Sequence, residues 1–179
     1  TELFGRGLRG NAGLRYVKTE QTASGYTFTA GAPLLSTVEE SYTDTLPSMN
    51  LVYDLTDDFL VRLGASKVMS RAGLGLLNPG AAVTVSGNNR TVASGNPALE
   101  PTRATAYDLG FEWYFAPEAL VGLALFYKDI DSFVQTARET GPFNENPSGL
   151  PDSVAIAACG TVVGCSPSAF WNFDTPINT

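Results

Sequence analysis

Residues 103–115 read Arg-Ala-Thr-Ala-Tyr-Asp-Leu-Gly-Phe-Glu-Trp-Tyr-Phe, and this stretch decides the fold. Successive side chains of a β-strand point to opposite faces, so residues two apart share a face. One face would carry Tyr107, Leu109, Phe111, Trp113 and Phe115, and the other Ala106, Asp108, Gly110, Glu112 and Tyr114. This alternation predicts a strand with one apolar, strongly aromatic face and one polar face.

The same period of two recurs along the chain. It predicts five long strands, at residues 8–19, 42–55, 59–71, 102–115 and 120–135. Strands of globular proteins usually have about 5–6 residues, whereas strands that cross a bilayer need roughly 9–11. The predicted lengths therefore favour strands that span a membrane.

The predicted connections are of two kinds. Residues 56–58 and 116–119 are tight turns, whereas residues 20–40, 72–101 and 136–179 are longer and rich in Gly, Asn, Pro and Ser. Outer-membrane barrels have short periplasmic turns and longer extracellular loops. We therefore expect an all-β fold, an antiparallel meander that forms a segment of a large transmembrane β-barrel. A soluble secreted β-sandwich that serves binding or adhesion would also alternate, and it is the rival interpretation.

The composition excludes several functions. Charged residues make up 16% of the chain and its net charge is -7, whereas nucleic-acid binding requires clustered Lys and Arg. Histidine is absent, which removes the commonest general base and transition-metal ligand. We expect no enzymatic activity, no metal site and no cofactor.

Five strands are too few to close a barrel, because single-chain outer-membrane barrels have at least about eight. An open sheet would leave unpaired edges and a large apolar surface exposed. The N-terminal residues also lack the basic and apolar regions of a signal peptide. We therefore expect this chain to be part of a larger protein that supplies the remaining strands.

A motif begins with Gly95-Asn96-Pro97-Ala98-Leu99-Glu100-Pro101 and continues with Tyr107-Asp108-Leu109-Gly110-Phe111-Glu112. It resembles a signature late in the barrel of the TonB-dependent receptors of the Gram-negative outer membrane. The stretches 46–58 and 126–131 fit the family as well. Residues 65–71 are similar to the group found in Xanthomonas- and Caulobacter-like bacteria.

The resemblance implies a location in the outer membrane, in contact with its lipid. It also implies active uptake of a small-molecule nutrient, with oligosaccharides favoured and ferric siderophores as the alternative. The partners implied are a plug domain inside a barrel of roughly 22 strands and the TonB complex, which binds an N-terminal TonB box. Neither the plug nor that box is found in these 179 residues.

A few residues are candidates for specific roles. Cys159 and Cys165 lie close together in a Gly- and Ser-rich stretch, which favours a disulfide over two free thiols. Arg71 and Arg103, at the outer ends of neighbouring predicted strands, could bind an anionic ligand or pair with acidic residues. Trp171 could stack on a sugar ring from an exposed loop, or it could lie at the start of another strand.

Overall fold

The computed structural model describes residues 2–29 and 32–179 of the chain. Its strands are β1 (Glu2–Leu3), β2 (Arg6–Thr29), β3 (Ala32–Asp54), β4 (Phe59–Ser70), β5 (Ala81–Ser86), β6 (Asn89–Ser94), β7 (Thr102–Ala116), β8 (Ala119–Asp131), β9 (Val134–Pro142) and β10 (Phe170–Asn178). Its helical turns are η1 (Leu74–Leu77), η2 (Phe143–Glu145) and the α-helix α1 (Asp152–Cys159).

The chain divides into two compact units. Unit 1 comprises residues 1–19, 42–70 and 102–131, and unit 2 comprises residues 20–41, 71–101 and 132–179. The long strands β2 and β3 contribute residues to both units.

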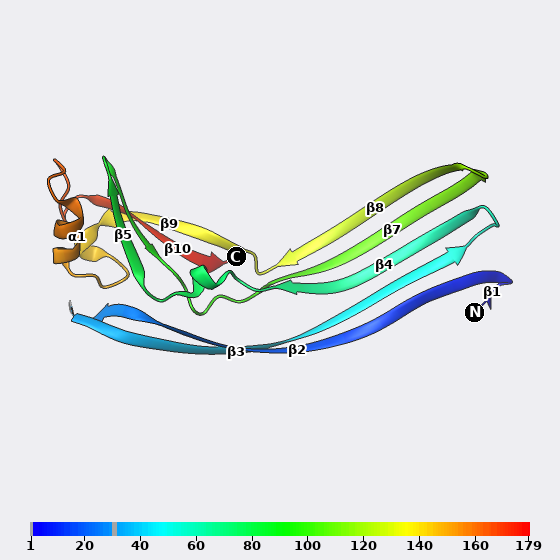
Figure 1. The fold of residues 1–179 in the computed structure, drawn as a ribbon, viewed down its shortest axis with the longest axis horizontal. Coiled ribbons are helices and arrows are strands. Elements are labelled where there is room, and N and C mark those ends of the chain that lie inside the picture. The colour runs from blue at the N-terminus through cyan, green and yellow to red at the C-terminus, as the bar shows by residue number, and fades with distance from the viewer. Residues whose placement is uncertain (1, 30–31) are drawn as a thin grey trace. The chain divides into compact units, whose positions relative to one another are not determined.

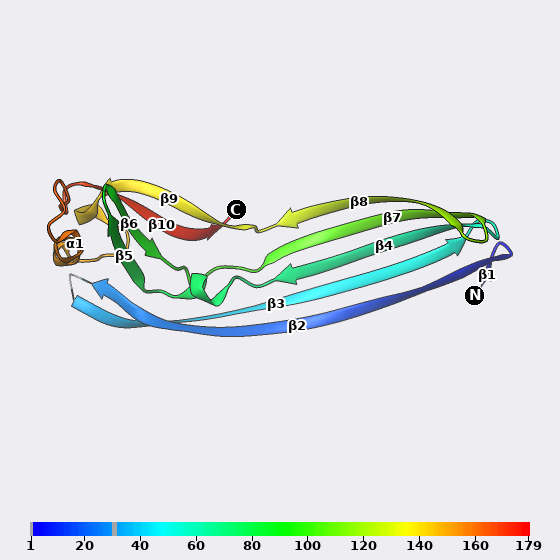
Figure 2. The ribbon, with the colours of Figure 1, turned by 45° about the horizontal axis from the view of Figure 1, so that its top comes forward.

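Unit 1 is a sheet whose strands follow the order β1-β2-β3-β4-β7-β8. Figures 1 and 2 show β4, β7 and β8 side by side, and each neighbouring pair is antiparallel. The turn between β3 and β4 is closed by the Leu55 amide, which donates to the Phe59 carbonyl at 2.9 Å. The predicted all-β, antiparallel arrangement is confirmed, and β4 and β7 each end within one residue of the predicted bounds.

The segments expected to be loops are largely strand. Residues 20–29 and 32–40 continue β2 and β3, where the sequence led us to expect an irregular connection. Residues 136–179 contain most of β9, then η2, α1 and β10, and residues 72–101 contain the β5–β6 hairpin. The apolar alternation is weak in residues 20–29 and 32–40, so the sequence pattern did not predict that the strands continue there.

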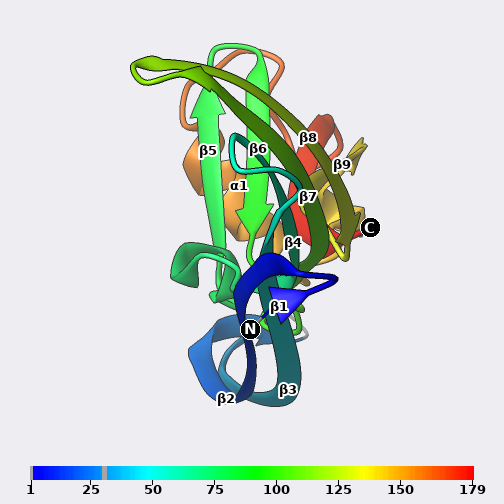
Figure 3. The ribbon, with the colours of Figure 1, turned by 90° about the vertical axis from the view of Figure 1, so that its right-hand side faces the viewer.

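Unit 2 contains a sheet with the strand order β5-β6-β10-β9. Figure 3 shows the β5–β6 hairpin, whose turn includes Gly87 at a φ of +59°. β10 pairs with β9 antiparallel and with β6 parallel, so that Phe173 is the partner of Val92. The partners in β10 and β6 are 81 residues apart in sequence, so this pairing joins the segments 71–101 and 132–179 of unit 2 in one sheet.

The hydrophobic core of unit 2 lies between this sheet and α1. The side chain of Phe143 is fully buried, and its ring meets the Trp171 indole edge-on with centroids 4.9 Å apart. The buried members of the core are Val92, Phe143, Leu150, Ala155, Cys159, Trp171 and Phe173. Among the described residues, no helix is both long and apolar enough to cross a membrane.

Gly95 and Asn96 explain part of the motif quoted above. A Cβ on Gly95 would lie 2.3 Å from the Asn78 carbonyl oxygen, so only glycine fits there. The Asn96 side chain accepts a hydrogen bond from the Ala98 amide at 3.0 Å and donates one to the Pro176 carbonyl at 3.1 Å. The motif thus forms a turn, as its Gly and Asn residues predict, and the turn also holds β10.

Candidate functional site

The sheet of unit 1 has one face that is apolar across four strands. Leu51 is paired with Leu63, Leu63 with Leu109, and Leu109 with Leu125, so one row crosses β3, β4, β7 and β8. The rows beside it hold Met49, Ala65, Tyr107 and Tyr127 on one side, and Tyr53, Val61, Phe111 and Leu123 on the other. We call these three rows the apolar face. Many of its side chains are exposed, including Leu63 at 45% and Leu125 at 52%.

The apolar face is bounded by aromatic and then polar residues. Tyr107 and Tyr127 stack with ring centroids 6.4 Å apart, and the next row toward the far ends of these strands is Lys67, Thr105 and Asp129. Trp113 and Phe115 lie near the β7–β8 turn with centroids 5.5 Å apart. From Tyr107 to Phe115 the strand covers about 26 Å, which is similar to the ~25 Å apolar band of an outer-membrane barrel.

The opposite face of the same sheet is polar. Arg62 and Glu112 form an ion pair across β4 and β7, and the Tyr114 hydroxyl donates to Glu112 at 2.8 Å. Arg9 pairs with Asp54 through two hydrogen bonds of 3.0 Å. These contacts join neighbouring strands side chain to side chain, and they hold charges on a face that must therefore meet water or other polar groups.

A hollow of about 440 Å³ lies in the middle of this sheet, where glycines replace larger side chains. It is lined by Arg62, Gly64, Asp108, Gly110 and Phe126, among others. Phe126 is 82% exposed and is the one bulky aromatic in the row formed with Asp108, Gly64 and Asn50.

Arg103 is paired with an acid instead of presenting a free guanidinium. Its Nε donates to Asp44 Oδ1 at 2.6 Å, and the Asp44 side chain is only 4% exposed. Within the described part of the chain, the other carboxylate oxygen of Asp44 is buried and has no hydrogen-bond partner. Arg71 follows β4, is exposed, and belongs to unit 2. Of the two roles considered for Arg103, the structure shows the acidic pairing.

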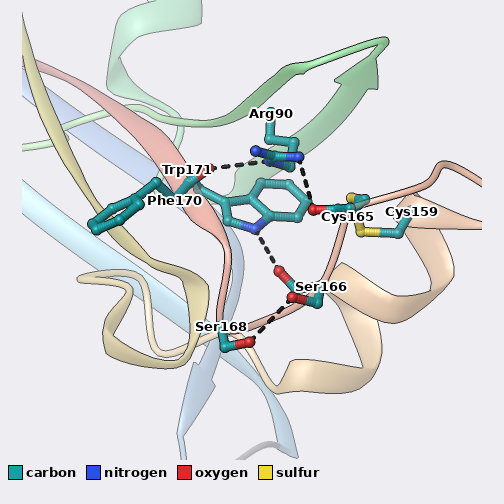
Figure 4. Close-up of a disulfide and its surroundings, with 8 residues drawn as sticks. Arg90, Cys159, Cys165, Ser166, Ser168, Phe170 and Trp171 are labelled. Carbon is teal, nitrogen blue, oxygen red and sulfur yellow. Dashed lines mark hydrogen bonds between the residues drawn. A yellow bond between two sulfur atoms is a disulfide. The ribbon is translucent and has the colours of Figure 1, made fainter.

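Trp171 belongs to the core of unit 2, and the exposed sugar contact expected of it is corrected on this ground. It is the second residue of β10, its side chain is 1% exposed, and its Nε1 donates to the Ser166 carbonyl at 3.1 Å (Figure 4). The neighbouring Phe170 is 69% exposed. Alternation along the strand turns Phe170 outward and Trp171 inward.

A disulfide joins Cys159, at the end of α1, to Cys165 (Figure 4). Arg90 of β6 lies beside it and donates to the carbonyls of Phe170, at 3.1 Å, and Gly164, at 3.3 Å. The disulfide loop is therefore tied both to the helix and to the sheet of unit 2.

The sequence reasoning missed a groove in unit 2. Two cavities of about 390 and 690 Å³ both include Tyr26, Ala81, Ser94 and Gly95 in their walls, so they adjoin. We call them together the Tyr26 groove. The signal in the sequence is weak, because Tyr26 lies in the polar stretch from Ser24 to Thr29, where only Tyr26 and Phe28 alternate with small residues.

A comparison with protein families identifies the chain. A model described as "TonB dependent receptor-like, beta-barrel" matches residues 3–164. The chain belongs to this family. TonB-dependent receptors are transporters of the Gram-negative outer membrane, and theirs is not a family of enzymes. The search of curated proteins and the search of solved structures found no match.

Membership of this family explains why the sheet of unit 1 has one apolar face and one polar face. In a TonB-dependent receptor the outer surface of the barrel meets lipid, and the lumen holds a plug domain that works with TonB. The apolar face fits the first environment and the face that carries Arg62 and Glu112 fits the second. No group of His, Cys, Asp or Glu among the described residues could hold a metal ion.

Proposed function

We propose that this chain forms part of the wall of an active transporter that carries a nutrient across the outer membrane of a Gram-negative bacterium into the periplasm. The main support for the proposal is the sheet of unit 1, which has an uncovered apolar face on one side and a charged face on the other. The chain that forms this sheet belongs to the TonB-dependent receptor family. An oligosaccharide is the favoured nutrient, and a ferric siderophore is the alternative. The amino-acid sequence of residues 65–71 supports placing this receptor in the Xanthomonas- and Caulobacter-type group.

The wall contributes no chemistry to transport. Its apolar face would hold the barrel in the lipid, and its polar face would line the lumen and contact the plug domain. Further barrel strands of the same protein would pair with the edge of β8. Energy would come from the TonB complex, bound to the N-terminal region of the receptor.

The longer connections would lie on the extracellular side. Their length supports this placement, because outer-membrane barrels have short periplasmic turns and longer extracellular loops. The disulfide between Cys159 and Cys165 fits any location outside the cytoplasm. On this placement unit 2 lies where a ligand first meets the receptor. Arg71 remains a candidate contact for an anionic ligand, such as a siderophore.

Growth of a strain that lacks the gene tests the proposal. We expect the deletion to abolish growth on one limiting nutrient from a panel of oligosaccharides and ferric siderophores, and the intact gene to restore it. Unchanged uptake of every nutrient would contradict the transport function. A chain that is monodisperse and melts cooperatively without detergent would instead favour a soluble β-sandwich.

A further inference from the structure

The Tyr26 groove combines residues from three parts of unit 2. One wall is the stretch 24–27 of β2, a second is the stretch 75–80 around η1, and a third is the loop 147–150. The β5–β6 hairpin forms the remaining wall. The combined volume falls within or above the usual ~300–1,000 Å³ of a small-molecule site, so the groove could take a ligand of several rings.

The wall formed by the hairpin is built of small side chains. Ala82 and Ala93 are cross-strand partners, and both are exposed in the groove. The other side of the hairpin holds Val83 and Val92 in or against the core of unit 2. The wall is therefore flat and is supported from behind by close packing, as a surface for a flat ring would be.

Gly25 allows the wall formed by β2 to lie close to the wall formed by the stretch 78–80. A Cβ on Gly25 would lie 2.8 Å from Asn78 Oδ1 and 2.9 Å from Pro79 Cγ. Asn78 is in turn fixed by the Gly80 amide, which donates to its Oδ1 at 2.9 Å. The backbone of β2 at Gly25 therefore lies so close to the stretch 78–80 that a larger residue would displace one of the two segments.

The chemistry of the lining is neutral throughout. No described residue that lines either cavity carries a charge. A buried charge on a ligand would need an opposite charge beside it. The lining provides only amide, hydroxyl and backbone groups.

Among the described residues of the lining, Tyr26 is the single aromatic one, and its side chain is 65% exposed. Among the residues that the structure describes, its hydroxyl makes no hydrogen bond, and neither does the side-chain amide nitrogen of Asn78 or the hydroxyl of Ser148. The exposed ring of Tyr26 therefore lies beside donors and acceptors that have no partner in the protein. This combination suits a ligand whose rings have apolar faces and carry hydroxyl groups at their edges.

We propose that the Tyr26 groove binds a segment of a neutral oligosaccharide, with one sugar ring stacked on Tyr26. The sugar hydroxyls form hydrogen bonds with the side-chain amide nitrogen of Asn78 and the hydroxyl of Ser148. Ala82 and Ala93 form a flat surface against which the ring packs. This inference rests on the proposed transport function and narrows its substrate to an uncharged sugar.

Binding to isolated outer membranes that contain the intact receptor tests the stacking contact. Labelled maltohexaose, cellohexaose and xylohexaose are the neutral probes, and hexagalacturonate is the anionic one. Tyr26→Ala should weaken binding of the neutral probe that the receptor accepts by at least about tenfold, as loss of a central aromatic contact does. Tyr26→Phe keeps the ring and should stay within about fivefold, because it loses one hydrogen bond.

Phe170→Ala is the matched control, because Phe170 is an aromatic residue of unit 2 with a similar exposure, 69%, and lies outside the groove. It should bind as the unmodified receptor does. Receptor abundance in each membrane is measured by immunoblot. Equal binding by the Tyr26→Ala and Phe170→Ala variants would overturn the inference.

A pair of opposite charges tests the neutrality of the ligand. Ala93→Asp and Ala93→Lys each place a charge on the flat wall, and both should weaken binding of a neutral probe to a similar extent. Two results together would overturn the inference. The unmodified receptor would bind hexagalacturonate more tightly than the neutral probes, and the Ala93→Lys variant would bind hexagalacturonate more tightly still, as a site for anions would.

The outcomes separate the inference from the proposed function. If the receptor imports a ferric chelate and binds none of the three neutral probes, transport stands and the neutral-sugar inference fails. If a neutral sugar is imported equally with Tyr26→Ala, transport again stands and the groove is not its site. If the gene supports import of no nutrient at all, the proposed function itself fails.

Discussion

Apolar and polar side chains alternate along strands of both units, but the apolar side chains are exposed in unit 1 and buried in unit 2. Of the described hydrophobic residues that are buried, only Ala104 lies in unit 1, and the others, Leu77, Val92, Leu99, Phe143, Leu150, Ala155, Cys159, Trp171 and Phe173, lie in unit 2. Unit 1 turns its apolar side chains outward, whereas unit 2 encloses them. Alternation therefore determines which residues share a face, and the surroundings determine whether that face becomes a core or a membrane surface.

Two aromatic pairs show this difference at the level of side chains. Tyr107 and Tyr127 stack while remaining 52% and 64% exposed. Phe143 and Trp171 meet edge-on at 0% and 1% exposure. Truncation should leave a cavity only in the second pair, because only there is the ring enclosed by other protein atoms.

The largest expected effect comes from Trp171→Ala in unit 2. The substitution should cost about 3–5 kcal/mol, since it removes a buried indole and leaves a cavity, and it should leave unit 1 folded. The measurement is the rate of proteolysis within residues 132–179 of the membrane-inserted receptor as urea is raised. A Tyr127→Ala control should not change this rate, and equal sensitivity of both variants would contradict the contrast between the units.

The next largest effect should come from an arginine on the apolar face of unit 1. Leu125→Arg should destabilise the folded receptor in a bilayer by about 2–4 kcal/mol, the cost of a lipid-facing cation near the membrane midplane. Ala124→Arg, one residue away on the polar face, should cost much less. Urea unfolding in lipid vesicles measures both, and a larger loss for Ala124→Arg would reverse our assignment of the two faces.

Removal of the disulfide should have a moderate effect that is confined to unit 2. Cys165→Ser opens a loop whose two cysteines are 6 residues apart, and it should cost about 2 kcal/mol on the chain-entropy model. The same loss should follow when the unmodified receptor is reduced. Protease susceptibility of the stretch 152–170 with and without dithiothreitol is the measurement, and a variant that still responds to the reductant would disprove the assignment.

The smallest expected effect is at the ion pair between Arg138 and Asp174 in unit 2. The hydrogen bond from Arg138, at 2.7 Å, lowers the pKa of Asp174. Because the folded-state pKa is lowered, the stabilisation is present above the ordinary carboxyl pKa and is lost as pH falls through the lowered value. Asp174→Asn should therefore cost less than about 1 kcal/mol at pH 7, since Arg138 is largely exposed.

Proteolysis of unit 2 as a function of pH checks the sign of this effect. The Asp174→Asn variant and the unmodified receptor should differ at neutral pH and converge in strong acid. A difference that grows on acidification would mean that the pair does not stabilise the charged form of Asp174.

The strands of unit 1 were predictable from sequence because their alternation is local. A two-residue period from Phe59 to Ser70 and from Thr102 to Phe115 is sufficient to set both faces of β4 and β7. The continuation of β2 and β3 beyond residue 19 and before residue 42 was missed. The apolar period is weak there while β2 and β3 remain neighbours in the sheet.

The site residues of unit 2 were not predictable for a different reason. Trp171 lies in the run Phe170-Trp171-Asn172-Phe173-Asp174, which could equally belong to an exposed loop. Its inward orientation follows from the pairing of β10 with β9, at Gly141, and with β6, some 80 residues earlier. The Tyr26 groove likewise combines segments far apart in sequence. The β5–β6 hairpin could have been recognised, because Gly87-Asn88 is a two-residue turn signal between alternating valines.

The two ends of the segment from Phe133 to Thr179 are hydrogen-bonded to each other, with the Phe133 amide at 3.0 Å from the Thr179 carbonyl and the Thr179 amide at 2.9 Å from the Phe133 carbonyl. The segment cannot be removed or exchanged without loss of the unit 2 sheet, because it supplies β9 and β10. A foreign binding domain could instead be inserted at an exposed point within it, such as Val163, which is 93% exposed.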